Sequence, residues 1–401
     1  MDIKIYPGKL AGTVRIPSSK SFSHRNIIAA ALAKGDSVVR DVSDSKDITV
    51  TCGAMTAFGA HISSESGIYN VEGIGSIPEN AYCDCGESGS TLRFMIPIAA
   101  ALGIETTFDG HGKLPERPIT PYIREFSKKG ISFDRNGGLP ITMKGRLQSG
   151  VFEIEGDISS QFITGLLFAL PLLDSESRIK LLSPLQSLPY ALMTIDVLKR
   201  SGIDVQYTGD EFIIPGGQHY SPIDVSTEGD YSQAAFFFTA NAINSDIYIR
   251  GLNENSVQGD KYIIDIINGL DGSGFECDVS DIPDLVPVLA VLGAAKGGAR
   301  LYNAARLRIK ESDRIESTAA LISALGGKTE TTQDSITIFP ADKFNGGEAD
   351  SCNDHRIVMA AAIASVYSDS PIIIHGAQAV EKSYPAFFDD FRSLGGRTEI
   401  L

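Results

Sequence analysis

Residues 18–25, with the sequence SSKSFSHR, combine side chains that can bind an anion. The apolar run Ile27–Ala33 that follows indicates a helix, so this polar segment is expected at a helix N-terminus. Free N–H groups and the positive end of the helix dipole favour an anion there. Serine hydroxyls can cap the helix or donate to a phosphate, and Lys20 and Arg25 add full charges. The alternative interpretation is a serine-capped surface helix with two solvated bases.

Length and charge limit the possible functions. The chain has 401 residues, which is long for one hydrophobic core, so two domains are expected. Its 43% hydrophobic and 21% charged residues are typical of a globular protein. The formal net charge of −15 argues against a nucleic-acid partner. A small anionic ligand is still compatible with this charge, provided that basic side chains converge in one place.

Neither a membrane segment nor a metal site is indicated. Residues Met1–Ile5 lead into a strand-like segment rather than a signal peptide, and Leu285–Ala295 is shorter than the roughly 18 residues that span a bilayer. We therefore expect a cytoplasmic protein with no membrane partner. The five cysteines are scattered and the six histidines lack ligand spacing. Reduced thiols, no metal and no cofactor are expected.

One pattern recurs six times: a strand-like segment, a polar loop and an apolar helix. The loops follow one another about every 70 residues with one shorter step, which suits a small α+β unit. Because the helices are apolar on nearly all faces, we expect them to be buried. Six such helices suggest two pseudo-threefold domains that face one another, with electropositive helix N-termini toward the gap. The loops lie at residues 18–21, 86–90, 156–161, 228–232, 280–284 and 352–356.

Other segments complete these units. The amphipathic stretches Tyr190–Gly202 and Glu311–Gly326 predict helices that end at glycine. Alternating segments predict strands at Ile3–Tyr6, Val151–Ile154, Ile223–Ser226 and Ile336–Phe339.

Seven motifs, taken in order, resemble the 5-enolpyruvylshikimate-3-phosphate synthase family of enolpyruvyl transferases. The match runs from about residue 5 to about residue 395, and the order of the motifs makes it specific. The motifs are Lys20-Ser21-x-Ser23-His24-Arg25, Gly89-Ser90-x-x-Arg93, Glu116-Arg117-Pro118-Ile119, Ser159-Ser160-Gln161, Lys310-Glu311-Ser312-Asp313-Arg314, Asn353-Asp354-His355-Arg356 and Lys382-Ser383-Tyr384-Pro385.

The resemblance implies an α+β fold of two pseudo-threefold domains, each with three βαβαββ units, described as an inside-out α/β barrel. Residues 19–227 would form a domain with loops for shikimate 3-phosphate. Residues 1–18 and 228–401 would form a second domain with catalytic acidic residues and bases for phosphoenolpyruvate. The active site would lie in the interdomain cleft. We expect a monomer that binds small anionic substrates and neither nucleic acid nor membrane.

The implied reaction transfers the enolpyruvyl group of phosphoenolpyruvate to the 5-hydroxyl of shikimate 3-phosphate and releases phosphate, on the pathway to chorismate and the aromatic amino acids. The family is the target of glyphosate. By similarity, shikimate 3-phosphate would be held by Lys20, Ser21, Arg25, Ser159, Ser160, Gln161, Ser187, Asp284 and Lys310, with Tyr190 beside the ring. Phosphoenolpyruvate would be held by Lys20, Gly89, Arg117, Gln161, Arg314, Arg356 and Lys382.

The reaction needs a base for the hydroxyl proton and an acid for the methylene carbon. Asp284 is the candidate base, and Glu311 and Lys20 are both candidates for proton exchange at the methylene carbon. Because a C–O bond breaks rather than a P–O bond, no Mg²⁺ is required. At Gly89, the missing Cβ would let the backbone approach the ligand.

Several residues have a structural alternative. Asp284 could cap the apolar helix that follows it, and residues 310–314 could be a solvated helix start with i,i+4 pairing. We expect His355 to orient its loop and Arg93 to brace the Gly89 loop. Glu87 stands where the family often has asparagine, and Arg306 stands where some members have asparagine.

Two other functions are alternatives to the implied one: a related transferase and a protein without catalytic activity. The sister enolpyruvyl transferase that acts on UDP-N-acetylglucosamine usually has a cysteine on a mobile loop, and residues 113–117 have none. A non-catalytic anion-binding protein would explain the bases but would leave Asp284 and Glu311 without a role.

Overall fold

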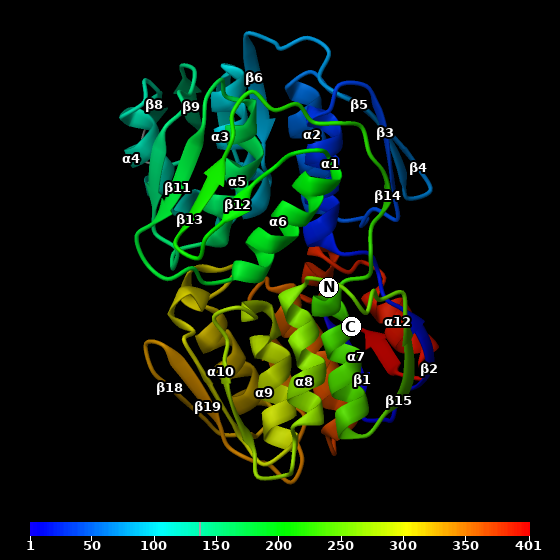
Figure 1. Cartoon of the computed structure of the whole chain (residues 1–401). Coiled ribbons are helices and arrows are strands. Elements are labelled where there is room, and N and C mark those ends of the chain that lie inside the picture. Colours follow the sequence, from blue (N-terminus) through cyan, green and yellow to red (C-terminus); the bar gives the residue numbers. More distant parts are fainter. Residues whose placement is uncertain (136–137) are drawn as a thin grey trace. The chain divides into compact units, whose positions relative to one another are not determined.

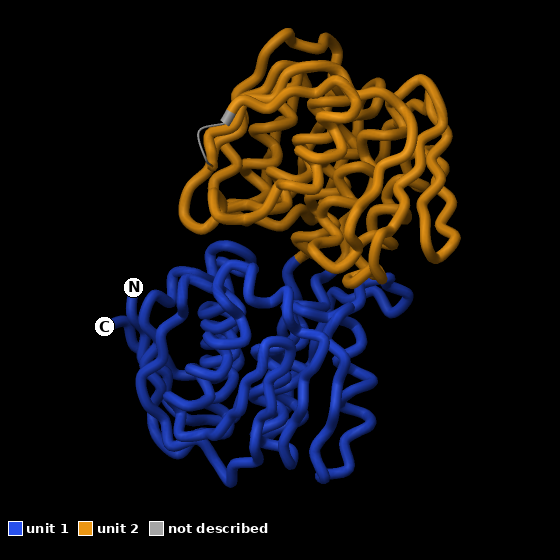
Figure 2. The backbone as a smooth tube through the Cα atoms, turned by 90° about the vertical axis from the view of Figure 1, so that its left-hand side faces the viewer, with its two compact units in different colours: residues 1–17, 229–401 blue, residues 18–228 orange. Residues whose placement is uncertain are grey.

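The chain folds into two compact units, here described from a computed structural model that covers residues 1–135 and 138–401. Unit 1 consists of Met1–Pro17 and Gly229–Leu401, and unit 2 of Ser18–Glu228, as Figure 2 shows. The chain crosses between the units at Pro17–Ser18 and at Glu228–Gly229. Each crossover lies one residue from the expected boundary.

Unit 2 contains three four-stranded sheets that share one strand order. The sheets are β14-β3-β5-β4, β6-β7-β9-β8 and β10-β11-β13-β12, and in each the first two strands are parallel and the others antiparallel. The strands are β3 (Asp36–Arg40), β4 (His61–Glu65), β5 (Ile68–Glu72), β6 (Asn80–Asp84), β7 (Glu105–Asp109), β8 (Ser132–Arg135), β9 (Ile141–Lys144), β10 (Val151–Ile154), β11 (Ser177–Leu181), β12 (Gln206–Tyr207), β13 (Glu211–Ile214) and β14 (Asp224–Ser226).

Each of these sheets belongs to a βαβαββ unit, in agreement with the expected repeat. The first unit is assembled from both ends of the segment, because its parallel edge strand, β14, is the last strand of unit 2 (Figure 1). The helices of unit 2 are α1 (Lys20–Leu32), α2 (Lys46–Ala57), α3 (Gly89–Leu102), α4 (Thr120–Ser127), α5 (Ser160–Ala169) and α6 (Leu188–Arg200).

Unit 1 has two four-stranded sheets, β20-β21-β1-β22 and β16-β17-β19-β18, and one two-stranded sheet, β15-β2. Its strands are β1 (Ile3–Tyr6), β2 (Ala11–Arg15), β15 (Asp246–Arg250), β16 (Phe275–Asp278), β17 (Ala299–Tyr302), β18 (Thr329–Thr331), β19 (Ser335–Ile338), β20 (Gly347–Asp350), β21 (Ile372–His375) and β22 (Arg397–Ile400). Its helices are α7 (Tyr231–Ile243), α8 (Ile263–Asn268), α9 (Val286–Ala295), α10 (Arg314–Ala324), α11 (His355–Ala364) and α12 (Phe387–Ser393).

The α+β fold class is therefore confirmed, with two refinements. One of the six units is reduced to a two-stranded sheet, and the six sheets do not join into a closed barrel within the described residues. Two predicted strands, Ile3–Tyr6 and Val151–Ile154, have the expected bounds. The strands predicted at 223–226 and 336–339 are each displaced by one residue at their start.

The predicted apolar helices form the cores of the two units. In α9, every residue from Val286 to Ala294 is buried, and α1 is buried from Phe22 to Leu32. The buried residues form two separate clusters, one in each unit. Among the described residues, no helix is both long and apolar enough to cross a bilayer.

Five of the six polar loops supply a side-chain cap to the helix that follows. A serine hydroxyl or aspartate carboxylate accepts a backbone N–H in the first turn, which satisfies a donor that the helix leaves free. The sixth helix, α9, is preceded by the 3-10 turn η4 (Pro283–Leu285), and neither has a side-chain cap. The capping residues are Ser19, Ser88, Ser159, Asp230 and Asp354.

Candidate active site

Helix α1 begins at Lys20, so most of the SSKSFSHR segment forms its first two turns instead of a loop before it. Burial explains the difference: Ser23, His24 and Arg25 have little access to water and are held inside the helix bundle. Lys20 remains partly exposed, and its Nζ lies 3.0 Å from Oδ2 of Asp47 in α2. The alternative of a surface helix with two solvated bases is therefore wrong.

Arg25 is a buried cation that is bonded to neutral oxygen atoms. Its Nε donates to Oγ1 of Thr194 at 2.9 Å, and its two Nη atoms donate to the carbonyls of Ser21 at 2.7 Å and Tyr190 at 2.9 Å. Burial lowers the pKa of Arg25 to about 10. A charge of this kind gains from an anionic ligand, because a bound anion offsets the cost of burying the guanidinium.

The N-termini of α3 and α5 meet through Gln161. The Nε2 of Gln161 donates to Oγ of Ser90 at 2.9 Å, and its Oε1 accepts from Nη1 of Arg93 at 2.6 Å. Arg93 also donates to the carbonyl of Pro118 at 3.1 Å. Arg93 thus fixes the amide of a predicted binding residue, and its role in bracing the Gly89 loop stays a prediction.

Arg117 occupies the space beside Gly89. A Cβ built on Gly89 would collide with Nη1 of Arg117, and Oε1 of Gln161 would lie 3.5 Å away. The sequence predicted that a missing Cβ would admit the ligand itself. In the structure the missing Cβ admits the guanidinium of another predicted ligand residue.

Two predicted serine ligands belong to the start of α5, and a third precedes α6. Ser159 caps α5 by accepting the N–H of Gln161 at 3.3 Å, and Ser160 is the first residue of the helix. Ser187 is buried and has a left-handed backbone, with φ of 58°, immediately before α6. This conformation is uncommon for a residue with a side chain, and it directs the chain into α6.

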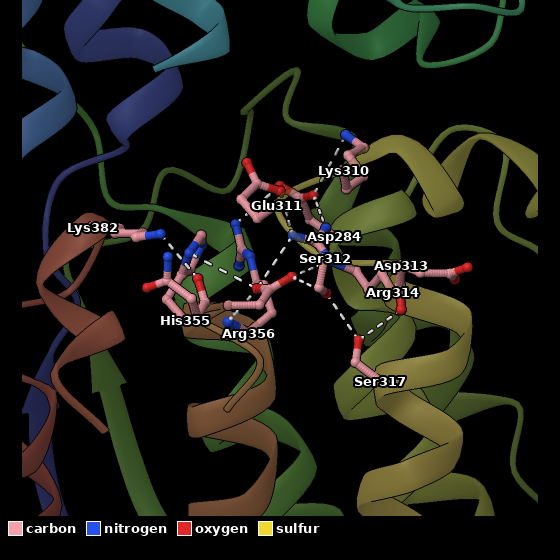
Figure 3. A network of polar contacts seen from close by, with 12 residues as sticks. Asp284, Lys310, Glu311, Ser312, Asp313, Arg314, Ser317, His355, Arg356 and Lys382 are labelled. Carbon is pink, nitrogen blue, oxygen red and sulfur yellow. Dashed lines mark hydrogen bonds and ion pairs between the residues drawn. The ribbon is translucent and has the colours of Figure 1, made fainter. Parts of the chain in front are cut away.

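In unit 1, Asp284 lies between two arginines (Figure 3). Its Oδ1 is 2.8 Å from Nη1 of Arg314, its Oδ2 is 3.0 Å from Nη2 of Arg356, and Nζ of Lys310 is 4.0 Å from Oδ1. Both oxygens bind arginine and the following helix has no side-chain cap, so the capping alternative does not describe this residue.

These cations set the charge state of Asp284. Burial raises the pKa of its carboxyl, but Arg356, Lys310 and Arg314 together outweigh burial and hold this pKa well below its ordinary value. Asp284 is therefore ionised at neutral pH. While both arginines bind it, it is a weak base for a hydroxyl proton.

Arg314 is held from several sides and is only 1% exposed. Its Nε lies 3.0 Å from Oδ2 of Asp354, and its Nη2 lies 2.9 Å from Oε2 of Glu311. Asp354 also caps α11 by accepting the N–H of Arg356 at 2.9 Å, so one buried carboxylate links the starts of α10 and α11. Residues 310–314 are thus not a solvated helix start.

Lys310 and Arg306 add positive charge beside Asp284. Burial, together with the positive charges of Arg306 and Arg314, lowers the pKa of Lys310 to about 8, although Asp284 opposes this change. Arg306 is mostly buried and donates to the carbonyl of Ser280. Since Lys310 precedes α10 in an extended conformation, the helix predicted from residue 311 begins only at Arg314.

The last two predicted motifs meet at the start of α11. Nζ of Lys382 donates to the carbonyl of Asn353 at 2.9 Å, and Nδ1 of His355 lies 4.0 Å from Oδ1 of Asp354 (Figure 3). The Asn353 loop is thus held by Lys382. The role of His355 in orienting this loop stays a prediction.

Comparison with known proteins identifies the chain. Residues 5–391 match the family model for EPSP synthase (3-phosphoshikimate 1-carboxyvinyltransferase). The chain belongs to the EPSP synthase family. It is 42% identical to the 3-phosphoshikimate 1-carboxyvinyltransferase of Clostridium kluyveri over 99% of this chain and 98% of that one, and 41% identical to that of Clostridioides difficile with the same coverage.

Solved structures agree with this membership of the EPSP synthase family. An EPSP synthase from Acinetobacter baumannii is similar over the full length of both chains, with a TM-score of 0.83 and 25% identity. The enolpyruvyl transferase NikO from Streptomyces tendae has the same fold, with a TM-score of 0.79 and 16% identity over 99% of this chain and 98% of that one. The expected family, fold class and transferase activity are therefore confirmed.

The sequence interpretation missed residues that hold the predicted EPSP synthase ligands in place. Asp354 stands inside a recognised motif at a helix start, so its capping position could have been noticed. Asp47 and Thr194 could not be found in this way, because each meets its partner only through packing between helices.

Proposed function

We propose that the chain transfers the enolpyruvyl group of phosphoenolpyruvate to the 5-hydroxyl of shikimate 3-phosphate, with release of phosphate, in the shikimate pathway. The observation that carries this proposal is the Asp284 carboxylate held by Arg314 and Arg356, which joins a candidate base to two arginines, the residue type suited to carboxylate and phosphate. Membership of the EPSP synthase family supports it.

The ligand assignments are part of the proposal, and both units would act on the same two substrates. Shikimate 3-phosphate would be bound by Lys20, Ser21, Arg25, Ser159, Ser160, Gln161, Ser187, Asp284 and Lys310. Phosphoenolpyruvate would be bound by Lys20, Gly89, Arg117, Gln161, Arg314, Arg356 and Lys382. A monomeric state and a cytoplasmic location stay predictions.

The ion pairs of Asp284 suggest how the base becomes active. An anionic substrate and Asp284 compete for the same two guanidinium groups. When phosphoenolpyruvate binds the two guanidinium groups, their positive charge compensates Asp284 less well, and a second negative charge lies near its carboxylate. The pKa of Asp284 therefore rises. The base would therefore strengthen when the substrate arrives, which is when a hydroxyl proton must be removed.

Arg314 would keep its orientation during this exchange, because Asp354 and Glu311 bind its other nitrogens. Addition then joins the 5-hydroxyl oxygen to the central carbon of the enolpyruvyl group while the methylene carbon gains a proton. Elimination of phosphate returns that proton to the protein. Glu311 and Lys20 both stay candidates for this exchange.

Phosphate release tests the proposal directly. The protein, phosphoenolpyruvate and an acceptor are incubated with EDTA, and inorganic phosphate is measured. We expect release with shikimate 3-phosphate and none with shikimate or UDP-N-acetylglucosamine. Release with UDP-N-acetylglucosamine would favour the sister transferase, and binding without release would favour a non-catalytic protein. Activity that EDTA abolishes and Mg²⁺ restores would contradict the metal-free reaction.

A further inference from the structure

A second carboxylate in unit 1, that of Asp260, has no part in the chemistry above. It belongs to the 3-10 turn η3 (Gly259–Tyr262) and is 3% exposed. One of its oxygens, Oδ2, accepts a hydrogen bond from the hydroxyl of Ser232 in the first turn of α7. The other, Oδ1, is buried without a hydrogen-bond partner among the described residues. Leaving a buried carboxylate oxygen unpaired costs free energy.

The charged groups that face Asp260 come from three other elements. Asp230 caps α7, Asp284 lies in η4, and Arg356 lies in the first turn of α11. Lys261 of the same turn donates to the carbonyl of Glu254 instead. Arg356 is therefore the one cation among the groups that act on this carboxylate.

The carboxyl of Asp260 has a raised pKa. Burial, together with the negative charge of Asp284, raises the pKa of Asp260 to about 7, while Arg356 and the Ser232 hydroxyl oppose this rise. A change in the position or charge of Arg356 would therefore change the protonation of Asp260 in the physiological range.

Arg356 is buried and incompletely bonded. Its Nη2 binds Asp284, whereas Nη1 and Nε are buried without a hydrogen-bond partner in the described part of the chain. Asp284, Asp230 and Asp260 all stabilise its positive charge. The guanidinium is thus bonded to one carboxylate and has donors left for an anion.

We propose that Asp260 is a positioning residue for Arg356. In the free protein Asp260 compensates the charge of Arg356, and it takes up a proton from solvent when Arg356 binds an anionic substrate. The inference rests on the proposed function, because phosphoenolpyruvate is the anion concerned. No substrate bond changes in this step. Asp260 acts through Arg356 and would influence affinity more than turnover.

A purely structural role would look different, and the chain allows the two roles to be separated. Gln258 already ties this turn to α7, because its Nε2 donates to the carbonyl of Gly229 at 2.8 Å and its Oε1 accepts the N–H of Tyr231 at 3.1 Å. D260N should therefore keep the turn in place while it removes the titrating group.

The test is calorimetric titration of phosphoenolpyruvate into the full chain at pH 7, in buffers with different ionisation enthalpies. We expect the wild-type protein to take up more protons than D260N when it binds phosphoenolpyruvate, because Asp260 gains a proton as Arg356 binds the anion. We also expect the KM for phosphoenolpyruvate to rise about fivefold between pH 6 and pH 8 relative to D260N, as one pKa unit of coupling to a group with a pKa of about 7 implies. Because the KM values of wild type and D260N are compared at the same pH, the titration of the substrate and of Lys310 affects both values equally.

S232A is the matched control. It removes the hydrogen bond that lowers the pKa of Asp260, so the pH dependence should persist with its midpoint at a higher pH. Equal proton uptake and equal KM profiles for D260N and wild type would overturn the inference. If D260N does not fold, an unchanged midpoint in S232A overturns it. Absence of phosphate release by the wild type would instead contradict the proposed function.

Discussion

The Oδ2 atom of Asp284 lies 3.0 Å from Nη2 of Arg356, although the two residues are 72 positions apart in the sequence. The carboxylate is 20% exposed and the guanidinium 4%. A candidate base and a candidate anion binder thus neutralise each other, and in the proposed reaction a substrate separates them.

Replacing Asp284 by asparagine tests the base. D284N keeps the shape of the side chain and removes its charge, so turnover should fall by about 100-fold or more if Asp284 takes the hydroxyl proton. The KM for phosphoenolpyruvate should not rise, because Arg314 and Arg356 lose a competing carboxylate. Steady-state kinetics measure both values. D369N, at an exposed aspartate that pairs with Lys343, is the control. Near-normal turnover with lower stability would contradict the assignment.

Gly89→Ala tests the contact with Arg117. The new methyl group collides with Nη1 of Arg117, so the guanidinium must move and phosphoenolpyruvate should bind more weakly. Glyphosate is longer than phosphoenolpyruvate, so its inhibition constant should rise by a larger factor than the KM. Gly53→Ala in α2 is a matched control, since a Cβ there would meet no atom within 4 Å. Equal factors for the two ligands would show that Gly89 does not border their site.

Arg25→Met separates binding from stability. The KM for shikimate 3-phosphate should rise by about 100-fold, because a charge-assisted contact to the anion is lost. The free energy of unfolding should change little, since an apolar side chain replaces a buried cation with neutral partners, and the Tyr190 carbonyl keeps a bond from Thr194.

Arg124→Met provides the contrast for Arg25, because Arg124 binds the carboxylates of Glu125 and Glu155. It should lower stability and leave shikimate 3-phosphate binding unchanged. Denaturant unfolding and steady-state kinetics give the two readouts. A large loss of stability in Arg25→Met would contradict the view that its charge is retained for a ligand.

The contact between His375 and Asp2, near the N-terminus, predicts that the stability of the protein depends on pH. Hydrogen bonds to Asp2 and Glu348 raise its pKa above the ordinary value, while burial lowers it only slightly. A raised pKa contributes stability that is fully present below the unfolded pKa of about 6.5 and is lost as pH rises through the folded pKa. His375→Ala should therefore destabilise the protein more at pH 6 than at pH 9.

Urea midpoints at the two pH values measure this difference for His375→Ala. The control is His61→Ala, at an exposed histidine of β4. An equal loss of stability at pH 6 and pH 9 would show that the two carboxylates do not hold the protonated imidazole.

The sequence by itself determined the helices and their polar starts. Capping chemistry and apolar composition are local properties, so the loops before α1, α3, α5, α7, α9 and α11 could be read from neighbouring residues. The repeat of those loops also predicted two α+β domains, but it did not predict that one unit is reduced to the β15-β2 pair.

Only the tertiary structure decided which charges are paired. Asp284 could equally have been a helix cap by its sequence, and packing between η4, α10 and α11 is what brings Arg314 and Arg356 to it. The same is true of Asp47 beside Lys20 and of the neutral oxygens around Arg25. Ion pairs and buried hydrogen bonds join groups that are distant in sequence. Their strength depends on burial and on distances of a few ångströms, which no spacing along the chain specifies.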